Sequence, residues 1–275
     1  MKLAHREWGS DHATRLVFLH GMGGTAALWR PIASVLEDEF KVIALDQRGH
    51  GGSRPVPLNP KTQKQDFSPL DFAGDVIETL QDMGVENAYI VGHSMGVRTA
   101  VATAHLDPMR VSGLALIDLG LTGPAGGGLG QALSDFLAVL PDHFPTRAEA
   151  KTYMDMHAPE ASIGLYLMAV SSVDESGKLT FPFDHESLIQ TINASIQISN
   201  EEWVRGFAKT GKPVLVFRGE KSLVYSHELF SKEQEMFKFF PNVKFIEISG
   251  ASHGLPFEKR KEFCKLITQW ASQTN

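Results

Sequence analysis

The sequence predicts an α/β fold with a mostly parallel central sheet, helices on both faces and an inserted helical cap. Two observations predict it. Short apolar runs alternate with helical patterns over the first 120 residues and again after residue 210. Between these two parts the alternation stops and only helical patterns remain. We therefore divide the chain into a core of residues 1–120 and 210–275 and a cap of residues 121–209.

The first part of the core supplies four strand candidates separated by helices. In chain order the expected strands are Leu16–Leu19, Lys41–Leu45, Ala88–Val91 and Gly113–Ile117. The expected helices are Thr25–Glu37, Pro69–Met83 and Val97–His105. This strand–helix order favours a parallel sheet, because a helix crosses over between consecutive parallel strands.

The cap segment has helical patterns and no strongly apolar strand. Its expected helices are Gln131–Leu140, Thr146–Met156, Ser162–Val170 and His185–Gln197. The alternation resumes with the strands Pro213–Phe217 and Val243–Ile248, each followed by a helix. The glycine-rich run 123–128 is expected to lead into the cap and Thr210–Lys212 to lead out of it.

Composition excludes several classes of protein. The 275 residues are 43% hydrophobic and 21% charged, with a net charge of -6 and no long basic run, so no nucleic-acid partner is expected. No stretch of about 18 apolar residues exists to span a membrane, and the first residues do not resemble a signal peptide, so a soluble, cytoplasmic protein is expected. Cys264 is the only cysteine, which excludes an internal disulfide and a zinc–thiolate cluster. The oligomeric state is left open.

The segment Val91–Gly96 reads Val-Gly-His-Ser-Met-Gly, directly between a predicted strand and a predicted helix. A serine between two glycines on such a tight turn is exposed on a strained backbone, with a helix N-terminus behind it. Other polar residues also follow predicted strands, and Ser94, Asp118 and His253 occur in this order. Because ligands collect at the carboxyl ends of parallel strands, these three side chains are expected at one edge of the sheet.

With these residues the chain resembles the α/β-hydrolase family over nearly its whole length. The matching stretches are His20–Gly24, Asp46–Ser53, Gly92–Gly96 and Ser252–Gly254. The resemblance implies Ser94 as the nucleophile, His253 as its base, and backbone N–H groups of Met22 and Met95 as the oxyanion hole. It implies scaffold turns for His20 and the stretch after Asp46, and neither a cofactor nor a metal.

The triad acid departs from the commonest family pattern. The usual aspartate position, in the loop Gly219–Val224, holds Ser222, and Glu220 is the only carboxylate there. Asp118 is the better candidate, although Glu220 stays open as an alternative. The arrangement resembles small intracellular esterases with Gly-His-Ser-Met-Gly, in which the acid follows the sixth strand and a serine takes the usual acid place. Ser222 is then a possible fourth member that bridges Asp118 and His253.

The sequence hypothesis is a serine carboxylic-ester hydrolase that acts on short or medium acyl esters through an acyl-enzyme. The cap is expected to roof the pocket with apolar side chains, namely Met154, Met156, Tyr166, Leu167 and Met168. An apolar roof favours uncharged small-molecule esters. The natural substrate is not fixed by the fold.

Two other classes of function remain open at this point. The stretch Gly21–Ala26 after a strand, with Asp46 ending the next strand, is also the layout of a dinucleotide site in an oxidoreductase. The second alternative is a non-hydrolytic or weakly active member of the fold, such as a ligand-binding receptor, an acyltransferase or a lyase.

Overall fold

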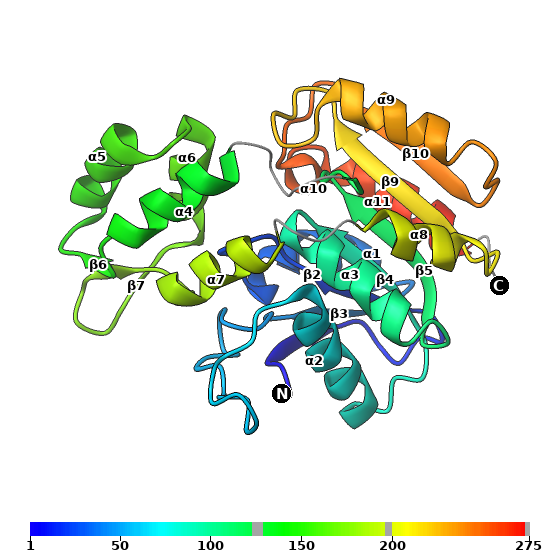
Figure 1. Cartoon of the computed structure of the whole chain (residues 1–275), viewed down its shortest axis with the longest axis horizontal. Coiled ribbons are helices and arrows are strands. Elements are labelled where there is room, and N and C mark those ends of the chain that lie inside the picture. Colours follow the sequence, from blue (N-terminus) through cyan, green and yellow to red (C-terminus); the bar gives the residue numbers. More distant parts are fainter. Residues whose placement is uncertain (123–128, 196–199, 273–275) are drawn as a thin grey trace.

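The computed structural model describes residues 1–122, 129–195 and 200–272, and this part of the chain contains a seven-stranded sheet (Figure 1). The strand order is β1-β3-β2-β4-β5-β9-β10. The strands are β1 (His5–Trp8), β2 (Arg15–Leu19), β3 (Lys41–Leu45), β4 (Ala88–His93), β5 (Val111–Ile117), β9 (Val214–Gly219) and β10 (Val243–Ile248). Only β1 runs antiparallel to its neighbour. The predicted α/β fold with a mostly parallel sheet is confirmed.

Helices cover both faces of the sheet, as the alternating pattern predicts. One face packs against α2 (Pro69–Asp82), α3 (Met95–Leu106), α8 (Glu201–Ala208) and α9 (His227–Met236). The other face packs against α1 (Arg30–Leu36), α10 (Leu255–Glu258) and α11 (Arg260–Ser272). Alternate strand residues enter the two apolar clusters, for example Ile90 in the first and Val91 in the second. Successive strand residues point to opposite faces, and both faces are covered by helices. The central strands are therefore continuous apolar runs in the sequence.

The cap forms its own apolar cluster beside the core (Figure 1). It contains α4 (Leu129–Val139), α5 (Arg147–His157), α6 (Ala161–Val170) and α7 (His185–Ser195). The described residues also include a small sheet, in the order β6-β8-β7, made of β6 (His143–Phe144), β7 (Ser172–Val173) and β8 (Leu179–Thr180). The sequence pattern does not predict this sheet, because two-residue strands leave no recognisable alternation. The expected entry segment 123–128 lies outside the described residues.

Helix α8 lies within the range 121–209 that the sequence assigns to the cap, yet it packs on the core. Val204 and Phe207 belong to the apolar cluster that contains the strands of the large sheet. Its polar first turn and its buried apolar face are those of a helix on the surface of a sheet. In the packing of the described residues, α4–α7 and the small sheet surround the cap cluster, whereas α8 packs with the core.

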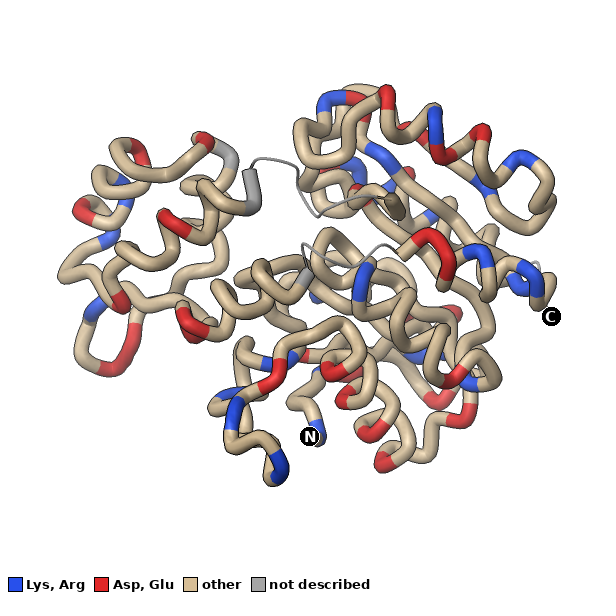
Figure 2. Tube along the Cα trace, viewed as in Figure 1, with Lys and Arg blue, Asp and Glu red and all other residues tan. Residues whose placement is uncertain are grey.

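Acidic and basic residues occur in both the core and the cap (Figure 2). Figure 2 shows acidic and basic positions interspersed along the outer helices and loops of the core and of the cap. Among the described residues, no helix combines the length and the apolar character needed to cross a membrane. Cys264 lies on the buried side of α11, in the same cluster as Phe263 and Ile267. Burial raises the pKa of the Cys264 thiol to about 11.

Candidate active site

The turn at Ser94 joins β4 to α3 and forces the serine into a strained backbone. Ser94 has φ 54° and ψ −119°, a conformation that non-glycine residues rarely adopt. The flanking glycines permit this turn, because a Cβ at Gly92 would overlap the carbonyl oxygen of Gly96 and a Cβ at Gly96 would overlap that of Leu19. The strain and the close approach together explain the Gly-x-Ser-x-Gly pattern.

Ser94, His253 and Asp118 form a continuous chain of hydrogen bonds at the carboxyl edge of the sheet. The Ser94 hydroxyl lies 3.0 Å from His253 Nε2, and His253 Nδ1 lies 2.7 Å from Asp118 Oδ2. Asp118 follows β5, the neighbour of β4, and is fully buried. The partners fix the tautomer: Nδ1–H donates to the carboxylate, and Nε2 is left to accept from the serine.

The Asp118 carboxylate is held by donors from the β9 loop as well as by His253. The Gly219 N–H donates to Oδ1 over 2.8 Å, and the Ser222 hydroxyl donates to Oδ2 over 2.5 Å. The Ser222 oxygen in turn accepts from the N–H groups of Val224 and Tyr225. A hydroxyl has one hydrogen to donate and two acceptor positions, so these three bonds use its full capacity. Of the two triad residues that Ser222 was expected to bridge, it therefore bonds Asp118, and its hydroxyl has no position left for a bond to His253.

Glu220, the alternative acid, lies elsewhere. Its Oε2 accepts from the Gly250 N–H over 2.6 Å and from the Ser249 hydroxyl over 2.9 Å. These bonds, first of all that from Gly250, lower the pKa of Glu220 below its ordinary value. The structure thus brings Asp118, and not Glu220, to the imidazole of His253.

The loop after β2 packs against Ser94. The position of a Cβ on Gly21 is 3.1 Å from the Ser94 Cβ, and the Gly24 N–H closes a turn onto the Gly21 carbonyl over 3.0 Å. Met22 lies inside this turn, and Met95 is the first residue of α3, directly after Ser94. Both expected oxyanion donors therefore belong to backbone segments that border the nucleophile. Their side chains pack together with Val56, Phe67 and Phe72.

Three buried histidines surround the site and are held neutral. Burial lowers the pKa of His20 to about 4, and that of His50 and His93 to about 3. His20 lies 2.7 Å from the Gly21 carbonyl through Nδ1 and accepts the Gln47 N–H at Nε2 over 3.0 Å. The ring of each histidine thus positions backbone rather than exchanging protons.

His93 is a site residue that the sequence analysis did not single out. Its Nε2–H donates to the carbonyl oxygen of His253 over 2.8 Å, and the two rings lie 4.9 Å apart. This bond fixes the backbone of the base from within the serine turn. The sequence signal for His93 is its position directly before Ser94. Because successive residues of a strand point to opposite faces, His93 and Ser94 are expected to point to different sides of the sheet.

The dinucleotide alternative does not fit the described geometry. The Asp46 carboxylate accepts from the Ala26 N–H over 2.6 Å and from the Gly52 N–H over 2.9 Å, so both oxygens hold backbone. In a dinucleotide site this carboxylate is free to bind a ribose. The glycine loop also leads into a four-residue 3-10 helix, Ala26–Trp29, rather than directly into a long helix.

The cap residues expected to roof the pocket lie in three different environments. Met154, Leu167 and Met168 are buried in the cap cluster. Met156 is 70% exposed and does not line an apolar slot. Tyr166 approaches the site: its hydroxyl oxygen is 2.9 Å from the position of a Cβ on Gly24.

Among the described residues, no group of three or more histidine, cysteine, aspartate or glutamate side chains is arranged to hold a metal ion.

Comparisons with known proteins agree with this geometry. Residues 14–260 match the family described as "alpha/beta hydrolase fold", and the chain belongs to this family. A putative esterase/lipase of Haemophilus influenzae is 24% identical over 244 residues, which is 89% of this chain and 78% of that protein. The 2-(acetamidomethylene)succinate hydrolase of Mesorhizobium japonicum is 27% identical over 256 residues, 90% of this chain and 84% of that protein.

A solved structure agrees over nearly the full length. A marine microorganism esterase superposes with a TM-score of 0.76 at 24% identity and covers 98% of this chain and 99% of its own. The family, the fold and these relatives define the protein as a hydrolase of the α/β-hydrolase fold.

Proposed function

We propose that this hydrolase cleaves uncharged carboxylic esters with short or medium acyl chains, through an acyl-enzyme on Ser94. The observation that carries the proposal is the unbroken chain from Ser94 through His253 to the buried Asp118. A serine hydroxyl is a weak nucleophile at neutral pH and needs an adjacent base. His253 is that base, and the Asp118 carboxylate already orients its ring.

In the proposed reaction, Ser94 Oγ attacks the ester carbonyl while His253 Nε2 takes its proton. The N–H groups of Met22 and Met95 stabilise the oxyanion that forms. His253 then gives the proton to the departing alcohol, which leaves an acyl group on Ser94. A water molecule, deprotonated by the same nitrogen, attacks this acyl group and releases the acid. Asp118 stabilises the imidazolium formed in both steps.

A panel of p-nitrophenyl esters from acetate to dodecanoate tests this function. We expect turnover of the short and medium esters and a loss of about 10⁴-fold or more in kcat for Ser94→Ala. A burst of one p-nitrophenolate per enzyme would mark the acyl-enzyme. If Ser94→Ala keeps the wild-type rate, or if the wild type hydrolyses no ester, the proposal is wrong. Product analysis with an added alcohol separates hydrolysis from acyl transfer.

The acid is tested with two carboxylates on neighbouring loops. Asp118→Asn loses the charge that orients His253 and is expected to lower kcat by about 10³- to 10⁴-fold. Glu220→Gln is the matched control: the Glu220 carboxylate accepts from Ser249 and Gly250, and kcat is expected to stay within about 2-fold of the wild-type value. The reverse order of effects would assign the acid to Glu220.

A further inference from the structure

The turn at His50 touches both the oxyanion loop and the cap. The Gly23 N–H donates to His50 Nε2 over 3.0 Å, and His50 Nδ1 donates to the Arg48 carbonyl over 2.8 Å. The ring therefore bridges two backbone segments with one nitrogen each. It is fully buried, so a missing partner at either nitrogen would be costly.

The cap is joined to the same turn by backbone hydrogen bonds. The Gly51 N–H donates to the Pro182 carbonyl over 2.7 Å, and the Asp184 N–H donates to the Gly49 carbonyl over 3.3 Å. His50 and Phe183 pair between them as an isolated antiparallel bridge. This short antiparallel pairing attaches the segment before α7 to the turn that carries His50.

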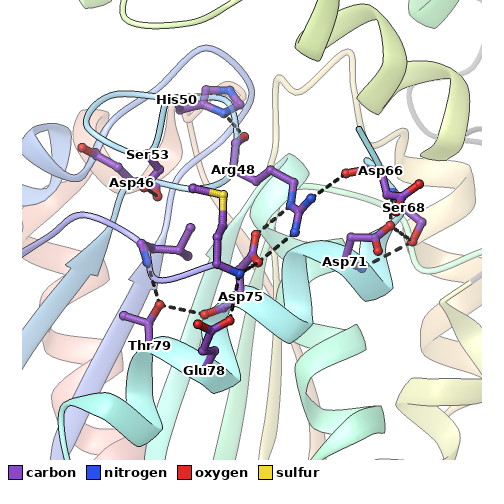
Figure 3. A network of polar contacts seen from close by, with 12 residues as sticks. Asp46, Arg48, His50, Ser53, Asp66, Ser68, Asp71, Asp75, Glu78 and Thr79 are labelled. Atoms are coloured by element: carbon purple, nitrogen blue, oxygen red, sulfur yellow. Dashed lines mark hydrogen bonds and ion pairs between the residues drawn. The ribbon is translucent and has the colours of Figure 1, made fainter. Parts of the chain in front are cut away.

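The other side of the His50 turn is anchored rigidly. Arg48 makes two parallel bonds to the buried carboxylate of Asp75 on α2, Nε to Oδ2 over 2.7 Å and Nη2 to Oδ1 over 2.8 Å (Figure 3). Its Nη1 donates to the Asp66 carbonyl over 2.9 Å. A bidentate, largely buried pair of this kind fixes orientation as well as distance. The backbone of Arg48, whose carbonyl accepts the hydrogen bond from His50 Nδ1–H, is therefore fixed in place.

We infer that His50 is a positioning residue of the oxyanion hole, through which cap docking sets the conformation of the loop 21–24. This inference rests on the proposed function. Gly23 follows Met22, so a bond that holds the Gly23 N–H also sets the peptide plane beside the proposed Met22 donor. The Phe183 ring lies 3.3 Å from the Cβ position of Gly23. The cap and the His50 ring therefore both contact Gly23. His50 touches no reacting atom and acts through this loop.

Three substitutions test the role of the His50 ring. His50→Leu keeps bulk without an acceptor, and His50→Asn is too short to reach both partners. Both are expected to lower kcat about 10- to 100-fold with KM within about 2-fold, because a donor misplaced by a fraction of an ångström fails mainly in the transition state. His50→Gln, which retains a long side chain with an acceptor, is expected to restore at least part of kcat.

An alkyl trifluoromethyl ketone supplies a second readout, since it forms a tetrahedral oxyanion on the serine. Its affinity is expected to fall by the same factor as kcat in His50→Leu and His50→Asn. If His50→Leu does not fold, His50→Asn decides. Wild-type kcat and wild-type ketone affinity in a folded His50→Leu or His50→Asn variant would overturn the inference.

His185→Leu is the matched control. His185 is a partly buried histidine at the same joint, with its ring 5.4 Å from the Phe183 ring, but its Nδ1 pairs with Asp142 at 3.2 Å. We expect its kcat within about 2-fold of wild type. An equal loss of kcat in this variant would assign the effect to cap packing and overturn the role of the Gly23 bond. Loss of activity in Ser94→Ala is tested separately, so the proposed function and this inference fail by different results.

Discussion

Ser222 and His253 donate to the same oxygen of Asp118, Oδ2, at 2.5 Å and 2.7 Å. The other oxygen, Oδ1, accepts the Gly219 N–H. The carboxylate next to the base is thus shared between the imidazole and a loop of the neighbouring strand. Its orientation depends on that loop, and the loop on Ser222.

Ser222→Ala is expected to lower kcat/KM about 5- to 10-fold and to destabilise the protein by about 1 kcal/mol. The substitution removes one donor from Asp118 and leaves the N–H groups of Val224 and Tyr225 without their acceptor. Ester kinetics and urea unfolding measure the two effects. Ser226→Ala removes the N-cap hydrogen bond of α9. It is expected to lower the free energy of unfolding by a similar ~1 kcal/mol and to leave the kinetics unchanged. Identical kinetics in the two variants would contradict the role given to Ser222.

The three buried histidines are expected to make stability fall as the pH drops from about 6.5 to 4. Their pKa values are about 3 to 4 in the folded protein against 6.5 in the unfolded chain. In this window only the unfolded state takes up their protons, so each histidine adds a slope approaching ~1.4 kcal/mol per pH unit. Urea unfolding at pH 7.5, 6.5, 5.5 and 5.0 measures it. A free energy of unfolding that stays level down to pH 5 would contradict the neutral, buried state.

Tyr225→Phe is expected to destabilise the protein by about 1–3 kcal/mol. The buried carboxylate of Glu233 accepts from the Tyr225 hydroxyl and, through its other oxygen, from the N–H and hydroxyl of Thr122 at 2.7 and 2.8 Å. Without the tyrosine hydroxyl, one oxygen of a buried charge loses its donor. Tyr153→Phe is the control, because the Tyr153 hydroxyl bonds an exposed carbonyl of Val139. The prediction is wrong if urea unfolding gives the same change for both.

Two glycine substitutions on helices are expected to act in opposite directions. A Cβ on Gly96 would overlap the backbone of Leu19, whereas a Cβ on Gly74 in α2 meets nothing within 4 Å. Gly74→Ala is expected to stabilise by about 0.5–1 kcal/mol, because alanine loses less backbone entropy in a helix. Gly96→Ala is expected to destabilise by about 3 kcal/mol or more. Thermal and urea unfolding test both, and equal stabilities would show that α3 does not pack so closely on β2.

The sequence predicted the sheet and the positions of Ser94 and His253 because their signals are local. A glycine-flanked serine between an apolar run and a helical pattern depends on fewer than ten neighbouring residues. β1, in contrast, reads His-Arg-Glu-Trp and has three exposed residues, so only its pairing with β3 makes it a strand. Such a polar edge strand carries almost no apolar pattern.

The features that the sequence does not determine depend on packing, on strand register and on the conformation of single turns. The amphipathic pattern of α8 identifies a helix with one apolar face but does not say whether core or cap receives that face. The hydrogen-bond partners of Ser222 depend on the conformation of its own turn, which brings the N–H groups of Val224 and Tyr225 to its hydroxyl oxygen. The register of β4 beside β5, which pairs His93 with Ile117 and so places Asp118 beside the serine turn, is set by tertiary pairing.

Because Cys264 is buried, chemical labelling of its thiol reports when α11 separates from the sheet. The thiol lies among the aromatic and aliphatic side chains of α11, and burial raises its pKa. Alkylating reagents attack the thiolate, so they reach this position only when the helix separates from the sheet. Mass spectrometry after timed exposure to iodoacetamide would then give the fraction of molecules that have opened, and no second thiol contributes to the signal.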